Sequence, residues 1–229
     1  AGSRGEDLLA QATALCLAQE GAKVTVNGRD AATLKATADE IRNATGADVL
    51  EVVADMSDPA GIEHLVQETV GQRGGLDVLV CNAGGPPAGT FASFPDDQAW
   101  LDAINLNLMS TLRLIRAGLP HLEARGGGSI TNIVSVSVKQ PIPHLILSNT
   151  ARTAVIGLAK SVSLEVAGKN IRVNNICPGS TMTDRILSTA RVRAEKEGRP
   201  IEAIIAADAA QIPMGRMGEP DEFARVVTF

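Results

Sequence analysis

The stretch PHLILSNTARTA at residues 143–154 contains a histidine, a serine and an arginine at regular spacing, side chains that donate hydrogen bonds or exchange protons. His144, Ser148 and Arg152 follow one another at intervals of four residues. On a helix, Ser148 and Arg152 share one face, because residues four apart lie one turn from each other. A guanidinium donates hydrogen bonds but keeps its proton, whereas an imidazole exchanges a proton near neutral pH. We therefore take His144 as the first candidate proton donor.

Two further groups precede this stretch. Ser135 lies thirteen residues before Ser148, and Lys139, in SVSVKQP, occupies the same loop as His144 but nearer to Ser135. Serine is a far weaker acid than tyrosine, whose reference pKa is about 10, and the chain contains no tyrosine. Ser135 and Ser148 are therefore poor proton donors, and Lys139 is the second candidate after His144. For both His144 and Lys139 the alternative is an ordinary solvated loop residue.

Short segments rich in Val, Ile and Leu alternate with segments of helical periodicity. We expect strands at residues 23–27, 48–54, 76–82, 128–135 and 171–179. We expect helices at residues 8–20, 30–44, 58–72, 97–119 and 148–167, and a charged helical lid at 191–208. This alternation predicts an α/β fold of the Rossmann type, with a doubly wound parallel sheet in three α/β/α layers. Ligands of such folds bind beyond the carboxyl ends of the strands.

Composition narrows the class of protein. The 229 residues are 45% hydrophobic, which predicts a single compact domain over residues 1–229. Because 21 basic residues face 26 acidic ones, the net charge of −5 offers no broad footprint for nucleic acid or an anionic membrane. Cys16, Cys81 and Cys177 lie far apart and lack a disulfide or zinc spacing, so we expect buried reduced thiols and a cytoplasmic location. We expect no metal.

Four motifs occur in an order and spacing that carry more information than periodicity. They are AGSRG at 1–5, CNAGG at 81–85, INLN at 104–107 and CPGSTMTDR at 177–185. Over nearly the whole chain they resemble the classical short-chain dehydrogenase/reductase family, especially its 3-oxoacyl-[acyl-carrier-protein] reductase-like members. The resemblance implies an NADP(H)-dependent oxidoreductase acting on a carbonyl or secondary alcohol, in a small molecule or an acyl thioester. It also leads us to expect that the family's first strand and C-terminal end are missing from this chain.

The resemblance implies a cofactor site spread over the strand ends. Gly2, Ser3, Arg4 and Gly5 match the end of the turn that receives the pyrophosphate. Arg29 and Arg4 resemble the NADP-preferring pattern, since cations accept a 2′-phosphate where a carboxylate favours NAD, the alternative cofactor. Asp30 sits where a helix N-cap belongs. The other matched positions are Asp55, Met56, Asn82, Ala83, Gly84, Arg152, Pro178, Gly179 and Thr183.

The resemblance also implies roles at the catalytic centre. Asn107 matches an asparagine that supports a water relay, and Ser135 matches the serine that positions the substrate carbonyl. Anchored on AVIGLAKS at 154–161, the register puts Ser148 at the position of the family's tyrosine and Arg152 at that of its lysine. Losing a well-placed general acid typically costs about 100-fold to 10,000-fold in rate. We therefore expect a slow or rerouted reductase with an atypical proton donor.

Two other classes of function remain as alternatives. One is a catalytically degenerate protein that binds the cofactor for a regulatory or structural purpose. The other is a lyase or isomerase that uses the same pocket without redox chemistry, because function belongs to sites rather than folds. The resemblance further implies a homo-oligomer, a tetramer or dimer, formed through the two long helices at 97–119 and 148–167. The region 183–212 would hold most of the substrate specificity.

Overall fold

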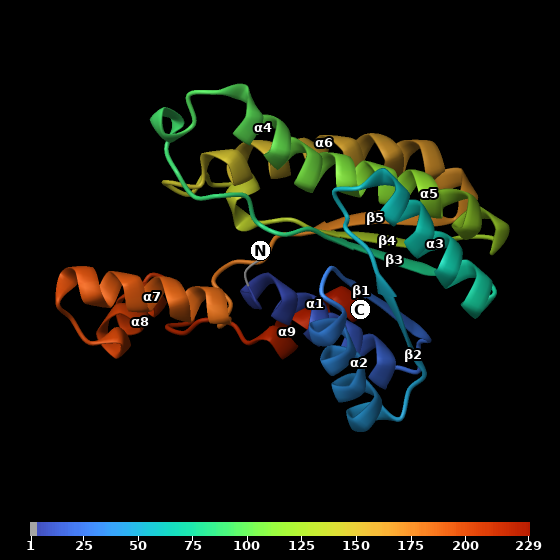
Figure 1. The fold of residues 1–229 in the computed structure, drawn as a ribbon, viewed down its shortest axis with the longest axis horizontal. Helices are drawn as coiled ribbons and strands as arrows, with labels where there is room; N and C mark the ends of the chain where they lie inside the picture. Colours follow the sequence, from blue (N-terminus) through green and yellow to red (C-terminus); the bar gives the residue numbers. More distant parts are fainter. Residues whose placement is uncertain (1–3) are drawn as a thin grey trace.

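The computed structural model describes residues 4–229, and it has the alternation of helices and strands that the sequence predicts (Figure 1). The strands of this part of the chain are β1 (Val24–Gly28), β2 (Val49–Val53), β3 (Val78–Asn82), β4 (Gly128–Ile133) and β5 (Ile171–Ile176). They begin close to the predicted positions, and those of 128–135 and 171–179 end earlier. All pairings between them are parallel, as expected for strands joined by crossover helices.

The strands form two parallel sheets, whereas the sequence predicts one. β1 pairs with β2, and β4 lies between β3 and β5 (Figure 1). No described strand lies between β1 and β3, so each of these strands has one edge without a strand partner in this part of the chain. The α/β class and the parallel pairing are confirmed, and the continuous sheet is corrected to two sheets that helices flank.

Most of the helices lie where the sequence predicts them. They are α1 (Arg4–Gln19), α2 (Ala31–Thr45), α3 (Pro59–Arg73), α4 (Asp97–Ile104), α5 (Ser110–Ala124), α6 (Ile146–Val166), α7 (Asp184–Glu197), α8 (Ile201–Ala209) and α9 (Pro220–Thr228). Asp30 and Asp58 are the N-caps of α2 and α3, and each carboxylate accepts a backbone N–H of the first turn. Gly46 ends α2 with φ of 71°, a backbone conformation that glycine adopts without steric cost.

The helix predicted at 97–119 is interrupted and longer. A π-helical turn, η2 (Asn105–Met109), separates α4 from α5, and α5 continues to Ala124. Such turns occur mostly as single insertions within α-helices, frequently at functional sites. Hydrophobic periodicity does not reveal the turn, because one extra residue barely changes the pattern of apolar positions.

The predicted lid at 191–208 is a pair of helices. α7 begins before residue 191, at Asp184, and ends at Gly198, whose φ is 62°. Pro200 then precedes α8, and the two helices are joined by an ion pair between Arg193 and Asp208 at 2.8 Å. Glycine in the left-handed conformation followed by proline is a common way to end a helix. The single helical segment is therefore corrected to a helical hairpin.

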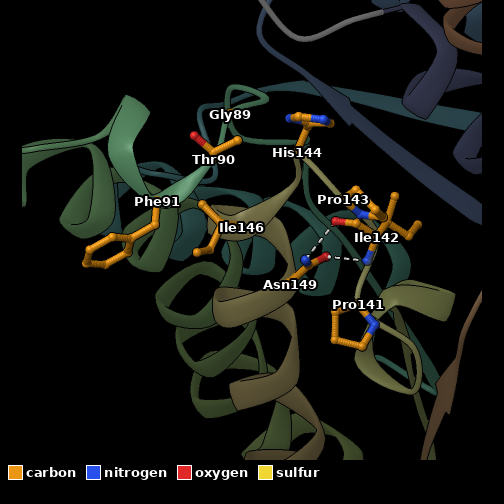
Figure 2. A pocket seen from close by; sticks show the side chains of 9 residues that line it. All are labelled: Gly89, Thr90, Phe91, Pro141, Ile142, Pro143, His144, Ile146 and Asn149. Atoms are coloured by element: carbon orange, nitrogen blue, oxygen red, sulfur yellow. Dashed lines mark hydrogen bonds between the residues drawn. The ribbon is translucent and has the colours of Figure 1, made fainter.

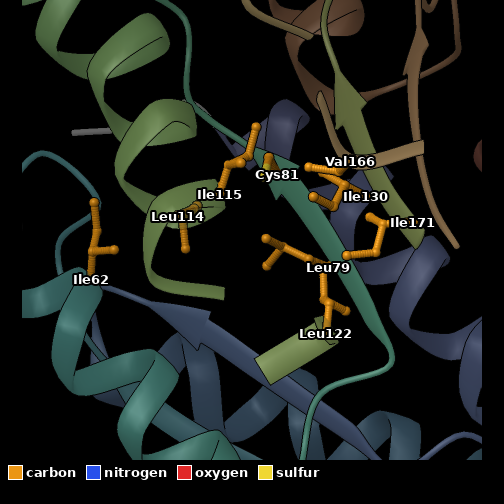
Figure 3. Packing of buried hydrophobic residues seen from close by; sticks show 9 residues of the cluster. All are labelled: Ile62, Leu79, Cys81, Leu114, Ile115, Leu122, Ile130, Val166 and Ile171. Atoms are coloured by element: carbon orange, nitrogen blue, oxygen red, sulfur yellow. The ribbon is translucent and has the colours of Figure 1, made fainter. Parts of the chain in front are cut away.

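The core connects the helices to the three-stranded sheet. Ile62 of α3 belongs to the same buried cluster as Leu114 of α5 and Leu79, Ile130 and Ile171 of the sheet (Figure 3). Because α3 follows β2 in the chain, this cluster links the two sheets. A second buried cluster joins α1 and α2 to β1 and β2. Among residues 4–229, no helix has both the length and the apolar character needed to cross a bilayer.

Removing part of this core tests its contribution. Ile130 is fully buried in β4, the strand that leads to Ser135. We expect Ile130→Ala to lower the free energy of unfolding by about 2–5 kcal/mol, through lost burial and the cavity left behind. Urea unfolding followed by circular dichroism measures this change. Val192→Ala, on the exposed face of α7, is the control and should change it by less than about 0.5 kcal/mol. Equal losses in both variants would contradict this assignment of the core.

Candidate active site

The ends of β3 and β4 bring two loops of the predicted site together. Asn82, the last residue of β3, lies opposite Ile133, the last residue of β4. Because the strands are parallel neighbours, the residues that follow them, Ala83 and Gly84 on one side and Ser135 on the other, leave the sheet at the same edge.

Arg152 reaches from α6 to both of these strand ends. Its Nη1 donates hydrogen bonds to the carbonyl oxygens of Ile133 at 3.3 Å and Val134 at 3.1 Å. Its Nη2 donates to the carbonyl oxygens of Ala83 at 3.0 Å and Gly84 at 3.4 Å. The residue is 6% exposed, and a planar guanidinium with several fixed donors suits such a bridge. Arg152 therefore braces the ends of both strands against α6.

Ser135 is oriented by its own backbone turn. It is the N-cap of a short 3-10 helix, η3 (Val136–Val138), and its Oγ accepts a hydrogen bond from the backbone N–H of Ser137 at 3.1 Å. The N–H occupies one lone pair of the oxygen and leaves the hydroxyl proton to be donated to a ligand. Ser135 is half-buried at the strand end. This arrangement suits a hydrogen-bond donor to a carbonyl oxygen.

Ser148 and His144 lie close in the chain but differ in setting. Ser148 is half-buried in the first turn of α6, one turn before Arg152 as predicted. His144 precedes the helix, is exposed, and has φ of 62°, which is uncommon for a residue other than glycine. No hydrogen bond between these two described side chains is present. Lys139 is exposed at the end of η3. The proton route from His144 or Lys139 stays a prediction.

Asn107 lies buried within the π-helical turn. Its Nδ2 donates to the carbonyl oxygen of Ala103 at 3.1 Å, and the residue is 2% exposed. Its Oδ1 has no hydrogen-bond partner among residues 4–229. A buried acceptor without a partner is unfavourable, so this oxygen would be stabilised by a polar ligand or an ordered water. That property fits the relay position which the resemblance implies.

A second polar bridge is not predicted by the sequence pattern. Nη1 of Arg113 donates to Oδ1 of Asn105 at 2.7 Å and to the carbonyl oxygen of Ser57 at 3.4 Å. Nδ2 of Asn105 donates to the same carbonyl oxygen at 3.1 Å. Ser57 follows Asp55 and Met56, so this bridge holds the loop after β2 against α5. The available signal was the first asparagine of INLN, two residues before Asn107.

An exposed arginine, Arg29, directly follows β1 and precedes Asp30. Asp30 Oδ1 accepts hydrogen bonds from Oγ1 of Thr33 at 2.7 Å and from its backbone N–H at 2.8 Å. These bonds, the side-chain one first, hold the pKa of the Asp30 carboxyl below its usual range. The Arg29 side chain is exposed and makes no hydrogen bond or ion pair with another residue of the described chain. An exposed cation therefore stands beside a carboxylate already engaged as an N-cap.

Asp55, after β2, is also engaged locally. Its carboxylate accepts from the backbone N–H of Ser57 at 2.8 Å and from the Ser57 hydroxyl at 2.7 Å. The backbone N–H is the main cause that lowers the pKa of Asp55, and the positive charge of Arg29 lowers it further. Met56 beside it is half-buried.

The remaining predicted cofactor residues have varied positions. Gly2 and Ser3 lie outside the described residues. Arg4 and Gly5 are the first residues of α1, so the helix begins at Arg4 and the predicted turn does not include them. The prediction that α1 begins at residue 8 is therefore wrong. Both nevertheless lie at a helix amino end, where anions bind readily.

The loop after β5 forms the other side of the site. The carbonyl oxygen of Pro178 accepts the backbone N–H of Val136 at 3.0 Å, which joins this loop to η3. Gly179 is exposed. Thr183 is buried as the N-cap of α7, and its Oγ1 accepts from the backbone N–H of Ile186 at 3.5 Å. Its hydroxyl thus lies where the loop meets the lid.

The cysteines lie in different surroundings. Cys16 and Cys81 are buried as predicted, and Cys177 is half-buried, which corrects the prediction for that residue. Burial raises the pKa of the Cys81 thiol to about 12, so it stays protonated and unreactive at neutral pH. Within the part of the chain that the structure describes, no group of three or more His, Cys, Asp or Glu side chains could hold a metal ion.

A groove of about 450 Å³ lies between the loop after β3 and the loop that precedes α6 (Figure 2). Residues 89–91 form one wall, residues 141–144 form the other, and Ile146 and Asn149 of α6 complete the lining. Of the predicted catalytic residues, only His144 lines it. Neither Ser135 nor Ser148 lines the groove, although its lining comes from the loop between them and from the same helix as Ser148.

Comparison with known proteins places this geometry among nucleotide-dependent enzymes. The family model for short chain dehydrogenase matches residues 4–193. Dehydrogenase/reductase SDR family member 4 from Bos taurus is 34% identical over 215 residues, which are 93% of this chain and 73% of that protein.

Two solved structures are similar over almost the whole chain. L-sorbose reductase from Gluconobacter frateurii, complexed with NADPH and L-sorbose, superposes with a TM-score of 0.92 at 31% identity, covering 96% of this chain and 84% of the other. A short-chain oxidoreductase from Pseudomonas aeruginosa PAO1, NADPH bound and described as containing an atypical catalytic center, gives a TM-score of 0.86 at 32% identity. This second match covers 100% of this chain and 86% of the other.

The Arg152 bridge is testable by stability. We expect Arg152→Met to lower the free energy of unfolding by at least about 2 kcal/mol, because a hydrogen bond to a charged group is worth about 1.5–3 kcal/mol and four carbonyl oxygens lose their donor. Urea unfolding measures the change. Lys160→Met, which removes an exposed cation two turns along the same helix, is the matched control. If the two variants were equally stable, the brace would not exist in solution.

The lowered pKa of Asp55 predicts a pH dependence of stability. A carboxyl group with a depressed folded-state pKa adds stability above its unfolded value of about 3.9, and this stability is lost as the pH falls through the folded value. The difference in unfolding free energy between the native chain and Asp55→Asn should therefore be level above about pH 5 and shrink at lower pH. Urea unfolding from pH 7 to pH 2 measures it. A difference that stays constant to pH 2 would show that the carboxyl is not perturbed.

Proposed function

We propose a function for this chain on one premise: it belongs to the short-chain dehydrogenase family. It is an oxidoreductase, and we propose that it reduces a carbonyl group with NADPH, or oxidises the corresponding secondary alcohol with NADP⁺, through an atypical proton donor. The observation that carries the proposal is Ser135, whose oxygen accepts the Ser137 N–H at 3.1 Å, which leaves its hydroxyl proton available for a ligand. The solved L-sorbose reductase acts on a ketose, which supports a carbonyl substrate. An acyl thioester, which the sequence also predicts, is another carbonyl of this kind.

The residues present fit NADP(H) better than NAD(H). The Arg29 guanidinium at the end of β1 is exposed, and the neighbouring Asp30 carboxylate is held by Thr33. An exposed guanidinium accepts the added phosphate of NADP(H), and one oxygen of the neighbouring carboxylate is already occupied as an N-cap. Both solved relatives contain NADPH. Arg29 and the amino end of α1 would hold the phosphates, and the loops with Ala83, Gly84 and Pro178 would contact the nicotinamide half.

The cofactor supplies or accepts the hydride when it is bound. The Ser135 hydroxyl donates a hydrogen bond to the carbonyl oxygen and stabilises the negative charge that grows there during reduction. The guanidinium of Arg152 keeps the loop with Ala83 and Gly84 in place and adds a fixed positive charge beneath the site. Asn107 offers its buried Oδ1 to a water that connects the site with the interior.

We propose that His144 supplies the proton. The chain has no tyrosine, and neither Ser148 nor Arg152 is acidic enough to act alone, because serine is a very weak acid and arginine keeps its proton. His144 lies at the edge of the site, and its exposed imidazole can take up a proton from solvent. The Ser148 hydroxyl, four residues further along the chain, would pass that proton to the substrate oxygen.

One observation favours a second candidate function, a cofactor-binding protein without catalysis. The terminal nitrogens of Arg152 hydrogen bond to backbone carbonyl oxygens, so this cation has a structural task that a ribose-binding lysine would not have. Such a protein would bind NADPH tightly and leave carbonyl compounds unchanged.

We further propose that residues 4–229 work as one domain, because the cluster with Ile62 and the Arg113 bridge both join the two sheets. Homo-oligomers through α5 and α6 fit the exposed Leu164 on α6. Confining the oligomer contact to this outer face would leave the site open.

The proposed reaction is tested by NADPH oxidation with a panel of ketones and 3-oxoacyl thioesters. Ser135→Ala and His144→Gln should each lower kcat by about 100-fold or more, which is the typical contribution of such groups. The Kd for NADPH should stay unchanged in both. Lys139→Met, in the same loop, is the control for His144 and should keep the native kcat. Tight NADPH binding without turnover of any panel member would contradict the reductase and favour the second candidate.

A further inference from the structure

The groove beside α6 exposes apolar side chains. Phe91 is 74% exposed and Ile142 is 36% exposed, although burying such side chains is favourable. Among the described residues that line the groove, none is Asp, Glu, Lys or Arg, and His144 is the single titratable one. The groove therefore lacks a counter-charge for an anionic ligand and offers apolar contact area instead.

One wall of the groove is held rigidly. Nδ2 of Asn149 donates to the carbonyl oxygen of Ile142 at 3.0 Å, and the backbone N–H of Ile142 donates to Oδ1 of Asn149 at 3.4 Å. Figure 2 shows these two bonds fixing the loop to α6. Pro141 and Pro143 restrict the backbone on both sides of Ile142. The apolar side chain is thus presented without a large loss of conformational entropy on binding.

The two walls are joined at one end. The backbone N–H of Gly89 donates to the carbonyl oxygen of His144 at 2.6 Å, and the N–H of Ile146 donates to the carbonyl oxygen of Gly89 at 3.4 Å. A Cβ atom on residue 89 would lie 2.6 Å from the ring of Phe94, so the close approach of these segments requires glycine. The groove is therefore preformed.

The groove also continues the loops that carry the proposed catalytic residues. One wall belongs to the segment that follows Gly84, whose carbonyl oxygen binds Arg152. The other wall follows Ser135 and leads into the first turn of α6, where Ile146 precedes Ser148 by two residues. The groove and the Ser135 site are therefore built on the same two loops and the same end of α6.

We propose that the groove binds the apolar, uncharged substituent of the carbonyl substrate. The inference rests on the proposed function and adds the class of substrate: ketones or 3-oxoacyl compounds with a hydrocarbon or aromatic group, rather than polyhydroxylated or anionic ones. A volume of about 450 Å³ suits a small molecule, since ligand pockets commonly measure about 300–1,000 Å³.

The molecule carries its own reporter for this groove. Trp100 is the one tryptophan of the chain. Its ring lies 6.0 Å from that of Phe91, centroid to centroid, and its indole N–H donates to the carbonyl oxygen of Phe94 at 3.2 Å. A ligand that packs on Phe91 will change the surroundings of the indole and hence its fluorescence.

The experiment titrates the full chain, without NADPH, with 2-octanone and with a ketohexose while the Trp100 emission is recorded. We expect a saturable change with 2-octanone and at least about tenfold weaker binding of the ketohexose. Ile142→Asp should weaken 2-octanone binding by about tenfold or more, and Ile142→Ser, a milder change at the same partly exposed position, by a smaller factor. Val226→Asp, which alters an exposed apolar residue on α9, should leave binding unchanged.

Three results would overturn the inference: no saturable change with 2-octanone, equal affinity for the ketohexose, or an emission change that depends on protein concentration because a second copy covers the groove. Parallel assays of NADPH oxidation separate this inference from the proposed function. If both ketones were turned over with equal kcat/KM and Ile142→Asp had no effect, the proposed reductase activity would be supported and the proposed role of the groove would be wrong. If 2-octanone changed the Trp100 emission specifically but no NADPH was oxidised, the groove would bind apolar ketones and the proposed reductase activity would be wrong.

Discussion

The site depends on one interaction, the set of hydrogen bonds from the Arg152 guanidinium to four backbone carbonyl oxygens. These bonds tie the ends of β3 and β4 to α6, and the loops that leave those strands carry Ser135, His144 and the residues that follow Asn82. Ser135 follows β4 directly, and the segment after β3 runs on to the wall of the groove at Gly89. A shift of this brace would move the hydroxyl, the cofactor loop and the groove together.

The brace also explains why arginine suits this position. A buried cation is unfavourable unless polar groups surround it, and a planar fork of donors can reach several carbonyl oxygens at once. A lysine ammonium, with three donors on a flexible stem, does not reproduce that geometry. Because the guanidinium keeps its proton, we propose that other groups carry the chemistry, with Ser135 as hydrogen-bond donor, Asn107 as a buried acceptor and His144 as proton source.

Local sequence signals predicted much of the fold, and contacts distant in the chain account for what was missed. The N-cap at Asp30 could be predicted because capping depends on a few neighbouring residues. The division into two sheets, the π-helical turn around Asn107 and the break of the lid at Gly198 follow from pairing and packing that periodicity does not encode. In the site, the i to i+4 spacing correctly predicted Ser148 and Arg152 on one helix. The partners of Arg152, however, are backbone atoms, which cannot be inferred from residue types. The groove was missed for a similar reason, since the exposure of Phe91 and Ile142 is a property of the folded loops.

The most direct test of this account is a crystal structure of the full chain with NADPH and an apolar ketone bound. We expect the Arg152 guanidinium to remain on the carbonyl oxygens of Ile133, Val134, Ala83 and Gly84, with Ser135 Oγ within about 3 Å of the ketone oxygen. A guanidinium that leaves these carbonyl oxygens for the nicotinamide ribose, with Ser135 turned away from the ketone, would contradict the account.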